Sequence, residues 1–305
     1  MTTGLAAPPL GRFVLTLALV AMGAGWGLTQ PLSKIAVSAG HGAMGLVFWQ
    51  LVVGAVLLSA INAARGVRLP MGRQSVMLYV FIAVLGTVLP NWGSFTSAYH
   101  LPAGVMSIVI SAVPMFAFPI ALALGTDRFS VIRLTGLLLG LAGVALIALP
   151  ETSLPDRAMV AFLPLALLAP FCYAVEGNVV GRWGTGGLDA LQVLQGASII
   201  GSVIALPLAF GMGQMADPRF AWGLPELAFL TSASIHAIVY STYVWIVGRA
   251  GAVFATQVSY LVTGFGILWA MILLGERYSV YIWVALAAML LGLTLVRPRP
   301  AQEEL

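Results

Sequence analysis

Ten apolar stretches follow one another along the chain, and they constrain the fold more than any other feature. A helix of roughly 20 mostly apolar residues is long enough to cross the hydrocarbon core of a bilayer. The breaks between the stretches are short, and none is long enough for a soluble domain. The sequence therefore predicts an all-α polytopic membrane protein with ten transmembrane helices, at residues 13–36, 43–64, 74–98, 102–124, 129–149, 160–182, 188–210, 226–247, 252–274 and 279–296.

The composition excludes several classes of protein. Of the 305 residues, 60% are hydrophobic and 8% are charged, whereas an ordinary soluble domain has about 25% charged residues. Most of the surface must therefore face the lipid bilayer. The basic residues are spread singly, which argues against a nucleic-acid partner. The single cysteine, Cys172, excludes an intrachain disulfide and a cysteine-based metal site, and no cofactor or metal is implied.

The basic residues also predict the orientation, because cytoplasmic loops carry more Lys and Arg than external loops. With the N-terminus inside, ten basic residues lie on the cytoplasmic side and four lie outside. This asymmetry predicts that both termini are cytoplasmic, and we expect the chain to lie in the cell inner (plasma) membrane. The four external basic residues are then Lys34, Arg157, Arg219 and Arg277.

An internal repeat relates the two halves of the chain. Residues 103–144 match residues 252–293 at a constant offset of 149, and the match includes the charged turns 127–130 and 276–279. Chance similarity between two apolar hairpins is the alternative. We divide the chain into residues 1–150 and 151–305, with five spans in each half of one integrated domain. Because five is odd, the second half enters the membrane inverted, as in many secondary transporters that work by alternating access.

Four stretches, in this order and spacing, resemble the ten-span EamA-type branch of the drug/metabolite transporter superfamily. They are Gly25-Trp26-Gly27 followed by Lys34, residues 98–104 with Pro114, residues 274–279 followed by Gly292, and Tyr173-Ala174 with Arg182. Within the superfamily the chain is most similar to the YddG-type exporters of aromatic amino acids. The resemblance implies ten helices and an amino-acid-like substrate. Members of the superfamily also carry threonine and other amino acids, cationic drugs and nucleotide sugars.

Glu176 is the only acidic residue well inside a predicted span. A carboxylate within the membrane is costly, which makes it a candidate for a functional role. It could bind the ammonium group of a substrate or carry a proton. Alternatively, the neighbouring Arg182 or a position near the interface keeps it hydrated.

Other candidates are aromatic or polar residues at the depth of the membrane. Rings there could stack on an aromatic ligand, and His236 could hydrogen-bond a carboxylate or titrate near neutral pH. Bonds between neighbouring helices would explain the same residues without a ligand. The predicted binding residues, besides Glu176 and His236, are Trp26, Gln30, Asn91, Ser111, Tyr173, Tyr240, Gln257 and Tyr260.

We considered three classes of function. The first is a transporter that exports aromatic or large neutral amino acids, with two halves rocking about a midplane cavity. The second is an intramembrane enzyme, but the chain has no His-Glu-x-x-His motif, no paired carboxylates within spans and no Gly-x-Ser-x-Gly elbow. The third is a channel, for which we find no filter segment. The sequence favours the transporter, and it leaves the exact substrate, the energy coupling and the oligomeric state open, a monomer included.

Overall fold

The computed structural model describes residues 12–217, 219, 222–250 and 258–295, which form helices and loops but no strand. Within these residues, each predicted span coincides with one helix or with a short series of helices. In chain order the elements are α1 (Arg12–Val37), α2 (Ala43–Ala64), α3 (Arg73–Ile82), η1 (Ala83–Val88), α4 (Leu89–His100), α5 (Ala103–Ile110), α6 (Val113–Ala123), α7 (Val131–Ala148), η2 (Arg157–Phe162), α8 (Leu163–Ala166), α9 (Leu168–Trp183), α10 (Ala190–Gly211), α11 (Leu224–Ala250), α13 (Val258–Leu274) and α14 (Val280–Leu295). The predicted all-α class is confirmed.

The lengths of the helices suit a membrane. Among the described residues, seven helical segments between Phe13 and Gly211 have at least 18 residues and are apolar enough to cross a bilayer. Of the remaining helices, α11 has 27 residues, and the apolar helices α13 and α14 have 17 and 16. An α-helix rises 1.5 Å per residue, so α11 is about 40 Å long. The chain is a multi-span membrane protein.

Two spans of the first half are interrupted near prolines. The third span contains the π-helical turn η1, where the N–H of Leu89 bonds to the carbonyl of Val84. Pro90 follows directly and has no N–H to give to the carbonyl of Gly86, four residues earlier. The fourth span breaks between α5 and α6, and Pro114 is the second residue of α6. Proline therefore disturbs the helical hydrogen bonding in the middle of both spans.

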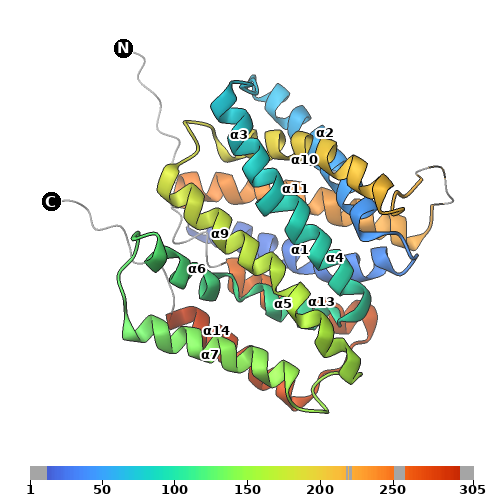
Figure 1. Ribbon diagram of the computed structural model, residues 1–305, viewed down its shortest axis with the longest axis vertical. Helices are drawn as coiled ribbons and strands as arrows, with labels where there is room; N and C mark the ends of the chain where they lie inside the picture. Colours follow the sequence, from blue (N-terminus) through green and yellow to red (C-terminus); the bar gives the residue numbers. More distant parts are fainter. Residues whose placement is uncertain (1–11, 218, 220–221, 251–257, 296–305) are drawn as a thin grey trace.

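The packing of the helices repeats between the two halves. Three contacts pair a span with its counterpart from the other half: α2 packs on α10, α5 of the fourth span packs on α13 of the ninth, and α7 packs on α14. The remaining large contacts come in equivalent pairs, since α1 packs on α11 and α13 while α9 packs on α4 and α6. Figure 1 shows α7 and α14 side by side along one edge of the bundle. Exchanging the halves reproduces the set of contacts, which is what a two-fold relation between inverted repeats requires.

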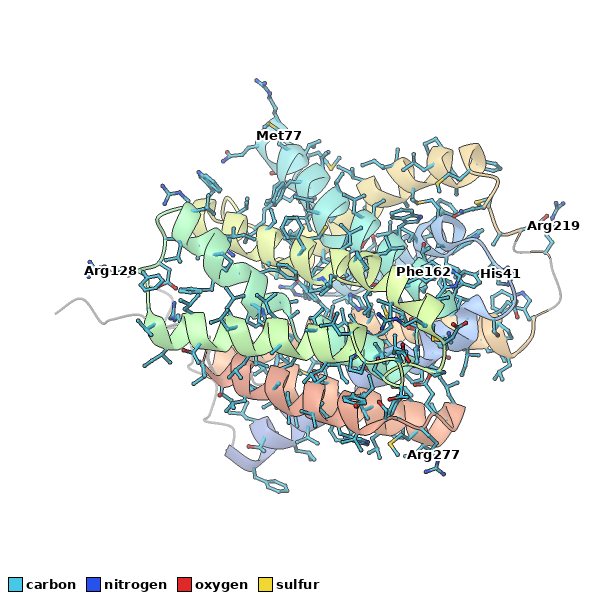
Figure 2. All side chains as sticks on the ribbon, turned by 60° about the horizontal axis from the view of Figure 1, so that its bottom comes forward. His41, Met77, Arg128, Phe162, Arg219 and Arg277 are labelled. Carbon is cyan, nitrogen blue, oxygen red and sulfur yellow. The ribbon has the colours of Figure 1, made fainter. Side chains whose placement is uncertain are left out.

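The loops gather at two opposite ends of the bundle. Figure 2 shows His41 and Arg219 at one end and Arg128 at the other. We name these the outer end and the inner end, following the predicted orientation. At the outer end, the N–H of Met44 donates to the side chain of Gln214 at 2.9 Å. At the inner end, Arg65 pairs with Asp189 at 2.6 Å. Both ends therefore have contacts that join the first half to the second.

Candidate functional site

Two close helix contacts fix the position of Trp26 in α1. A Cβ added to Gly27 would lie 2.8 Å from the backbone nitrogen of Gly266 in α13. A Cβ added to Gly25 would lie 2.9 Å from a methyl group of Val239 in α11. Any larger residue at either glycine would push α1 away from these neighbours, because small residues are what let membrane helices approach closely. The pattern Gly25-Trp26-Gly27 thus places one large ring among three tightly packed helices.

Trp26 belongs to a central aromatic cluster formed with His236, Tyr240 and Tyr243 of α11. Its ring centroid is 6.1 Å from that of His236 and 5.8 Å from that of Tyr243. Tyr243 is 6.4 Å from Tyr240. The indole Nε1 of Trp26 is buried and has no hydrogen-bond partner among the described residues. A buried donor without a partner is costly, which makes this atom a candidate contact for a ligand.

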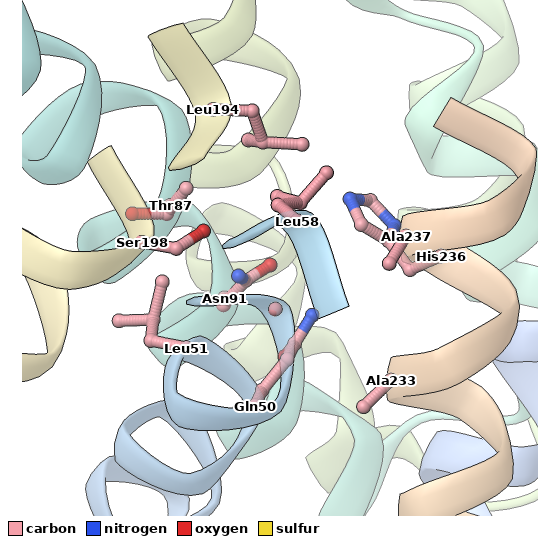
Figure 3. A pocket seen from close by; sticks show the side chains of 11 residues that line it. Gln50, Leu51, Leu58, Thr87, Asn91, Leu194, Ser198, Ala233, His236 and Ala237 are labelled. Carbon is pink, nitrogen blue, oxygen red and sulfur yellow. The ribbon is translucent and has the colours of Figure 1, made fainter. Parts of the chain in front are cut away.

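A small cavity of about 30 Å³ adjoins the cluster, between α2, η1, α4, α10 and α11. Figure 3 shows the side chains of Gln50, Thr87, Asn91, Ser198 and His236 around it. The Oε1 atom of Gln50 is buried without a hydrogen-bond partner in the part of the chain that the structure describes. The cavity is about the size of one water molecule, whereas pockets for small organic ligands start at roughly 300 Å³. Helices must separate before such a ligand can bind here.

Glu176 lies on α9, outside the set of residues that line the cavity. A Cβ added to Gly86 would lie 2.6 Å from its Oε2 atom, so the carboxylate rests against the π-helical turn η1. It interacts electrostatically with Tyr173 and with Tyr240. No hydrogen bond or ion pair joins it to another described residue, and the exposed Arg182 instead lies over the ring of Trp183. The carboxylate is therefore available to a cation or a proton.

The predicted binding residues separate into two groups. Asn91 and His236 line the cavity, Trp26 and Tyr240 belong to the cluster, and Tyr173 neighbours Glu176. Ser111 instead sits at the break between α5 and α6, where its hydroxyl donates to the carbonyl of Ile108 at 2.7 Å. The structure does not place Gln30 or Tyr260 at the cavity, and Gln257 lies outside the described residues.

Sequence reasoning missed four residues of this region: Gln50, Thr87, Ser198 and Tyr243. Helical spacing could have identified Tyr243, because it lies three residues after Tyr240 and seven after His236 on the same helix. Gln50 could have been found from its spacing with Gly54 and Leu58, which line the same cavity. The other two are small hydroxyl residues, which are common in membrane helices and carry no distinctive pattern.

The outer end carries a second cluster, which we name the outer latch. It consists of Lys34, Glu276 and Tyr278, which hold the junction between α4 and α5. Lys34 Nζ donates to the carbonyls of Tyr99 at 3.1 Å and Leu101 at 3.0 Å. These carbonyls end α4, where a positive charge is favourable. This contact joins the end of α1 to the junction.

Glu276 holds the other side of the junction, at the start of α5. Its carboxylate accepts the N–H groups of Ala103 at 2.8 Å and Gly104 at 3.1 Å, as expected for an acid at a helix N-terminus. The Tyr278 hydroxyl donates to the same carboxylate. Burial of Tyr278 raises the pKa of its hydroxyl above the ordinary value, and the hydrogen bond to Glu276 raises it further. Glu276 and Lys34 also attract each other electrostatically.

The repeat places Asp127 at the position equivalent to Glu276. Asp127 forms an ion pair with the buried Arg133 and accepts the N–H of Arg128 at 2.7 Å. Residues 252–253, which correspond to residues 103–104, lie outside the described residues. Among the described residues, the contacts of Asp127 thus stay within its own hairpin.

Comparisons with known proteins agree with this architecture. The chain is 26% identical over 290 residues to a probable terminal-alkyne amino-acid exporter of Streptantibioticus cattleyicolor, with 90% of each chain covered. It is 23% identical over 258 residues to a chloroplastic WAT1-related protein of Arabidopsis thaliana, covering 81% of this chain and 61% of that longer relative. A solved crystal structure of a protein that is 17% identical superposes with a TM-score of 0.63, covering 93% of this chain and 96% of the other.

The match to a protein family is the most informative comparison, because it occurs twice. The EamA-like transporter family matches residues 13–149 and again residues 161–297. The two matches together span most of the chain, including Trp26, Glu176 and His236. The chain belongs to the EamA-like transporter family, within the drug/metabolite transporter superfamily.

Proposed function

We propose that the protein exports aromatic or large neutral amino acids by alternating access, from the cytoplasm across the inner (plasma) membrane. The observation that carries this proposal is the aromatic cluster of Trp26, Tyr240 and Tyr243, together with Glu176 of α9, whose charge acts on Tyr240. The rings offer faces for an apolar side chain, and the carboxylate offers a partner for an ammonium group. The relative from Streptantibioticus, a probable amino-acid exporter, supports the same class of substrate.

The central polar groups complete the proposed binding site. The amides of Gln50 and Asn91 and the ring of His236 face the cavity, where they can hydrogen-bond the carboxylate of an amino acid. The unpartnered Trp26 Nε1 adds a further donor. On this proposal the protein acts as a carrier and not as an enzyme, because every group named here binds and none is arranged as a nucleophile with its base.

The outer latch fits this mechanism as the outer gate. It joins α1 and the α13–α14 hairpin to the junction between α4 and α5. The junction itself connects the span that lines the cavity with its neighbour. We propose that export to the outside requires Glu276 to leave the N-terminus of α5 and Lys34 to leave the C-terminus of α4. In the conformation described here both contacts are made, so the gate is closed.

An organic cation is the second candidate substrate. Glu176 beside Tyr173 and Tyr240 combines a carboxylate with aromatic faces, and this combination also suits an organic ammonium ion without a carboxylate. The two candidates differ in what they require from Gln50 and Asn91, because only an amino acid has a carboxylate for these amides to bind.

Counterflow in proteoliposomes tests the proposal. Vesicles are loaded with unlabelled phenylalanine, tryptophan, threonine, a nucleotide sugar or a quaternary ammonium ion, and entry of the labelled solute is followed with and without a pH gradient. We expect phenylalanine and tryptophan to support exchange, and Glu176→Gln and Tyr240→Ala to reduce it. Tyr281→Ala is a matched control, because Tyr281 is 41% exposed on α14 and does not line the cavity. Exchange of the ammonium ion alone would replace the amino-acid proposal with the second candidate.

A further inference from the structure

A second and much larger hollow lies on the other side of the contact between α2 and α11. It is a groove of about 410 Å³. The α2 residues Trp49, Val53 and Leu57 line it, whereas their neighbours Gln50, Gly54 and Leu58 line the central cavity. On α11, Leu230 and Ser234 face the groove while Ala233 and Ala237 face the cavity. The groove and the cavity are therefore separated only by the seam where these two helices meet.

The groove opens to the side of the bundle, and its walls are apolar. Val56 is 63% exposed and Leu230 is 37% exposed on two helices that cross the membrane, so both side chains meet lipid. Most of the remaining lining is aliphatic or aromatic, and the polar members lie chiefly at the outer end. There His41 pairs with Glu226 at 2.6 Å.

The rim of the groove marks its depth in the bilayer. Trp222 is 58% exposed beside the groove, and tryptophan collects at the level of the lipid headgroups. Trp49 donates its Nε1–H to the carbonyl of Ala216 at 2.9 Å, in the same outer region. The groove thus begins near the outer headgroups and extends toward Ser234, eight residues along α11 from Glu226. On α2 the groove extends past the middle of the helix, to Val56 and Leu57.

A hollow with these properties must contain hydrocarbon. An apolar hollow does not hold water, because water there lacks polar partners. An empty space of this size would deprive its lining of dispersion contacts. Packing, and not hydrophobic contrast, is what stabilises contacts inside a bilayer. An acyl chain that enters the groove gains contacts on several sides, which it does not have in bulk lipid.

We propose that the groove between α2 and α11 is a binding site for one acyl chain of an outer-leaflet phospholipid. The chain lies along Val53, Leu57 and Leu230, and the headgroup lies at the rim near Trp222 and the His41–Glu226 pair. Its position against the seam also closes the central cavity against the bilayer. The equivalent seam of the repeat, between α3 and α10, is instead filled by protein, because the fully buried Tyr79 packs on Gly196.

Native mass spectrometry tests this site without any transport measurement. The protein is reconstituted with phosphatidylethanolamine and phosphatidylglycerol, extracted, and washed with detergent until lipid bound at the general surface is removed. We expect wild type to retain one phospholipid molecule. Val53→Trp fills the groove from α2 and should lower the retained lipid about tenfold. Ser234→Phe fills it from α11 and provides a second variant if the first fails to fold.

Val203→Trp is the matched control, since Val203 is 67% exposed on α10 and does not line the groove. This variant should retain lipid as wild type does. The proposal is overturned if washed wild-type protein retains no phospholipid, or if the two groove variants retain as much as Val203→Trp. It is also overturned if phenylalanine displaces the lipid, which would make the groove a substrate site.

Discussion

The hairpins at residues 127–130 and 276–279 occupy equivalent places in the repeat, yet they make different contacts. Glu276 reaches across to the first half and caps α5. Asp127 pairs with Arg133 of its own hairpin. The first contact joins the two halves at the outer end, and the second stabilises a single turn at the inner end.

Two side chains distinguish the outer hairpin from the inner one. Glu276 is one methylene longer than Asp127, which extends the reach of its carboxylate. Tyr278 has a hydroxyl that donates to Glu276, whereas Phe129 has none and is 63% exposed. The two ends of an inverted repeat can thus differ in strength although their sequences match. We therefore expect substitutions in the two hairpins to have unequal effects on the outer gate.

The largest effect is expected from Glu276→Gln. Glutamine keeps the shape but removes the charge and one acceptor, so the cap on Ala103 and Gly104 weakens by about 2 kcal/mol. Outer opening should then become about 30-fold more frequent. A cysteine placed at Ser97, which is fully buried one turn before the junction, reports this opening in a Cys172→Ser background. Its labelling by a membrane-impermeant maleimide from outside should accelerate accordingly.

Asp127→Asn is the matched control for this variant. It removes the equivalent carboxylate at the inner end, and labelling of the cysteine at position 97 should stay at the wild-type rate. Equal acceleration in both variants would mean that the two hairpins are equivalent after all, and the outer latch would lose its special role.

A direct exchange of the two hairpin sequences should have the next largest effect. The double substitution Glu276→Asp with Tyr278→Phe gives the outer hairpin the same sequence as the inner one. The shorter carboxylate and the missing hydroxyl should cost about 1.5 kcal/mol, or about a tenfold increase in labelling. The reciprocal pair, Asp127→Glu with Phe129→Tyr, should leave the labelling rate unchanged. If labelling does not increase in the double variant of Glu276 and Tyr278, the length of the carboxylate side chain and the tyrosine hydroxyl do not explain why the two hairpins differ.

Lys34→Met should have a smaller effect on the same assay. The methionine keeps the apolar stem of the lysine but no longer donates to the carbonyls of Tyr99 and Leu101, a loss of about 1 kcal/mol. Labelling should rise about fivefold. Because Lys34 and Glu276 also attract each other, the double variant with Glu276→Gln should fall short of the product of the single effects. A fully multiplicative result would indicate two independent contacts.

The outer latch also shows which parts of the structure the sequence can predict. The helices follow from apolar stretches, which are local features, and Lys34 and Glu276 stood out as parts of short patterns. The contact between Glu276 and Ala103 joins residues 173 positions apart, and no single pattern reveals such a pairing. Thr87 and Ser198 could not be found for a related reason, because only the packing brings them to the same cavity as His236 of α11.

The smallest effect is expected at the inner end, where Asp189 of the second half pairs with Arg65 of the first. Burial opposes the charge on Asp189, but hydrogen bonds from Arg65 and from the backbone of Gln192 lower its pKa below the ordinary value. The pair is partly exposed, so its contribution to the free energy of unfolding is about 0.5 kcal/mol. Asp189→Asn removes the charge and keeps the N-cap of α10, and thermal unfolding in detergent should show it slightly less stable than wild type at pH 7.

Lowering the pH should remove the difference in stability between wild type and Asp189→Asn. The direction follows from the lowered pKa of Asp189. A carboxylate whose pKa is lower in the folded state stabilises that state above its unfolded pKa of about 3.9, and the stabilisation disappears as the pH falls through the folded value. Wild type should therefore converge on Asp189→Asn below about pH 4. The Glu276→Gln variant keeps Asp189, so its free energy of unfolding should fall by the same amount over the same pH range. A pH response of Asp189→Asn equal to that of wild type would remove the Arg65–Asp189 pair from the contacts that join the halves, and the inner end would then depend on packing alone.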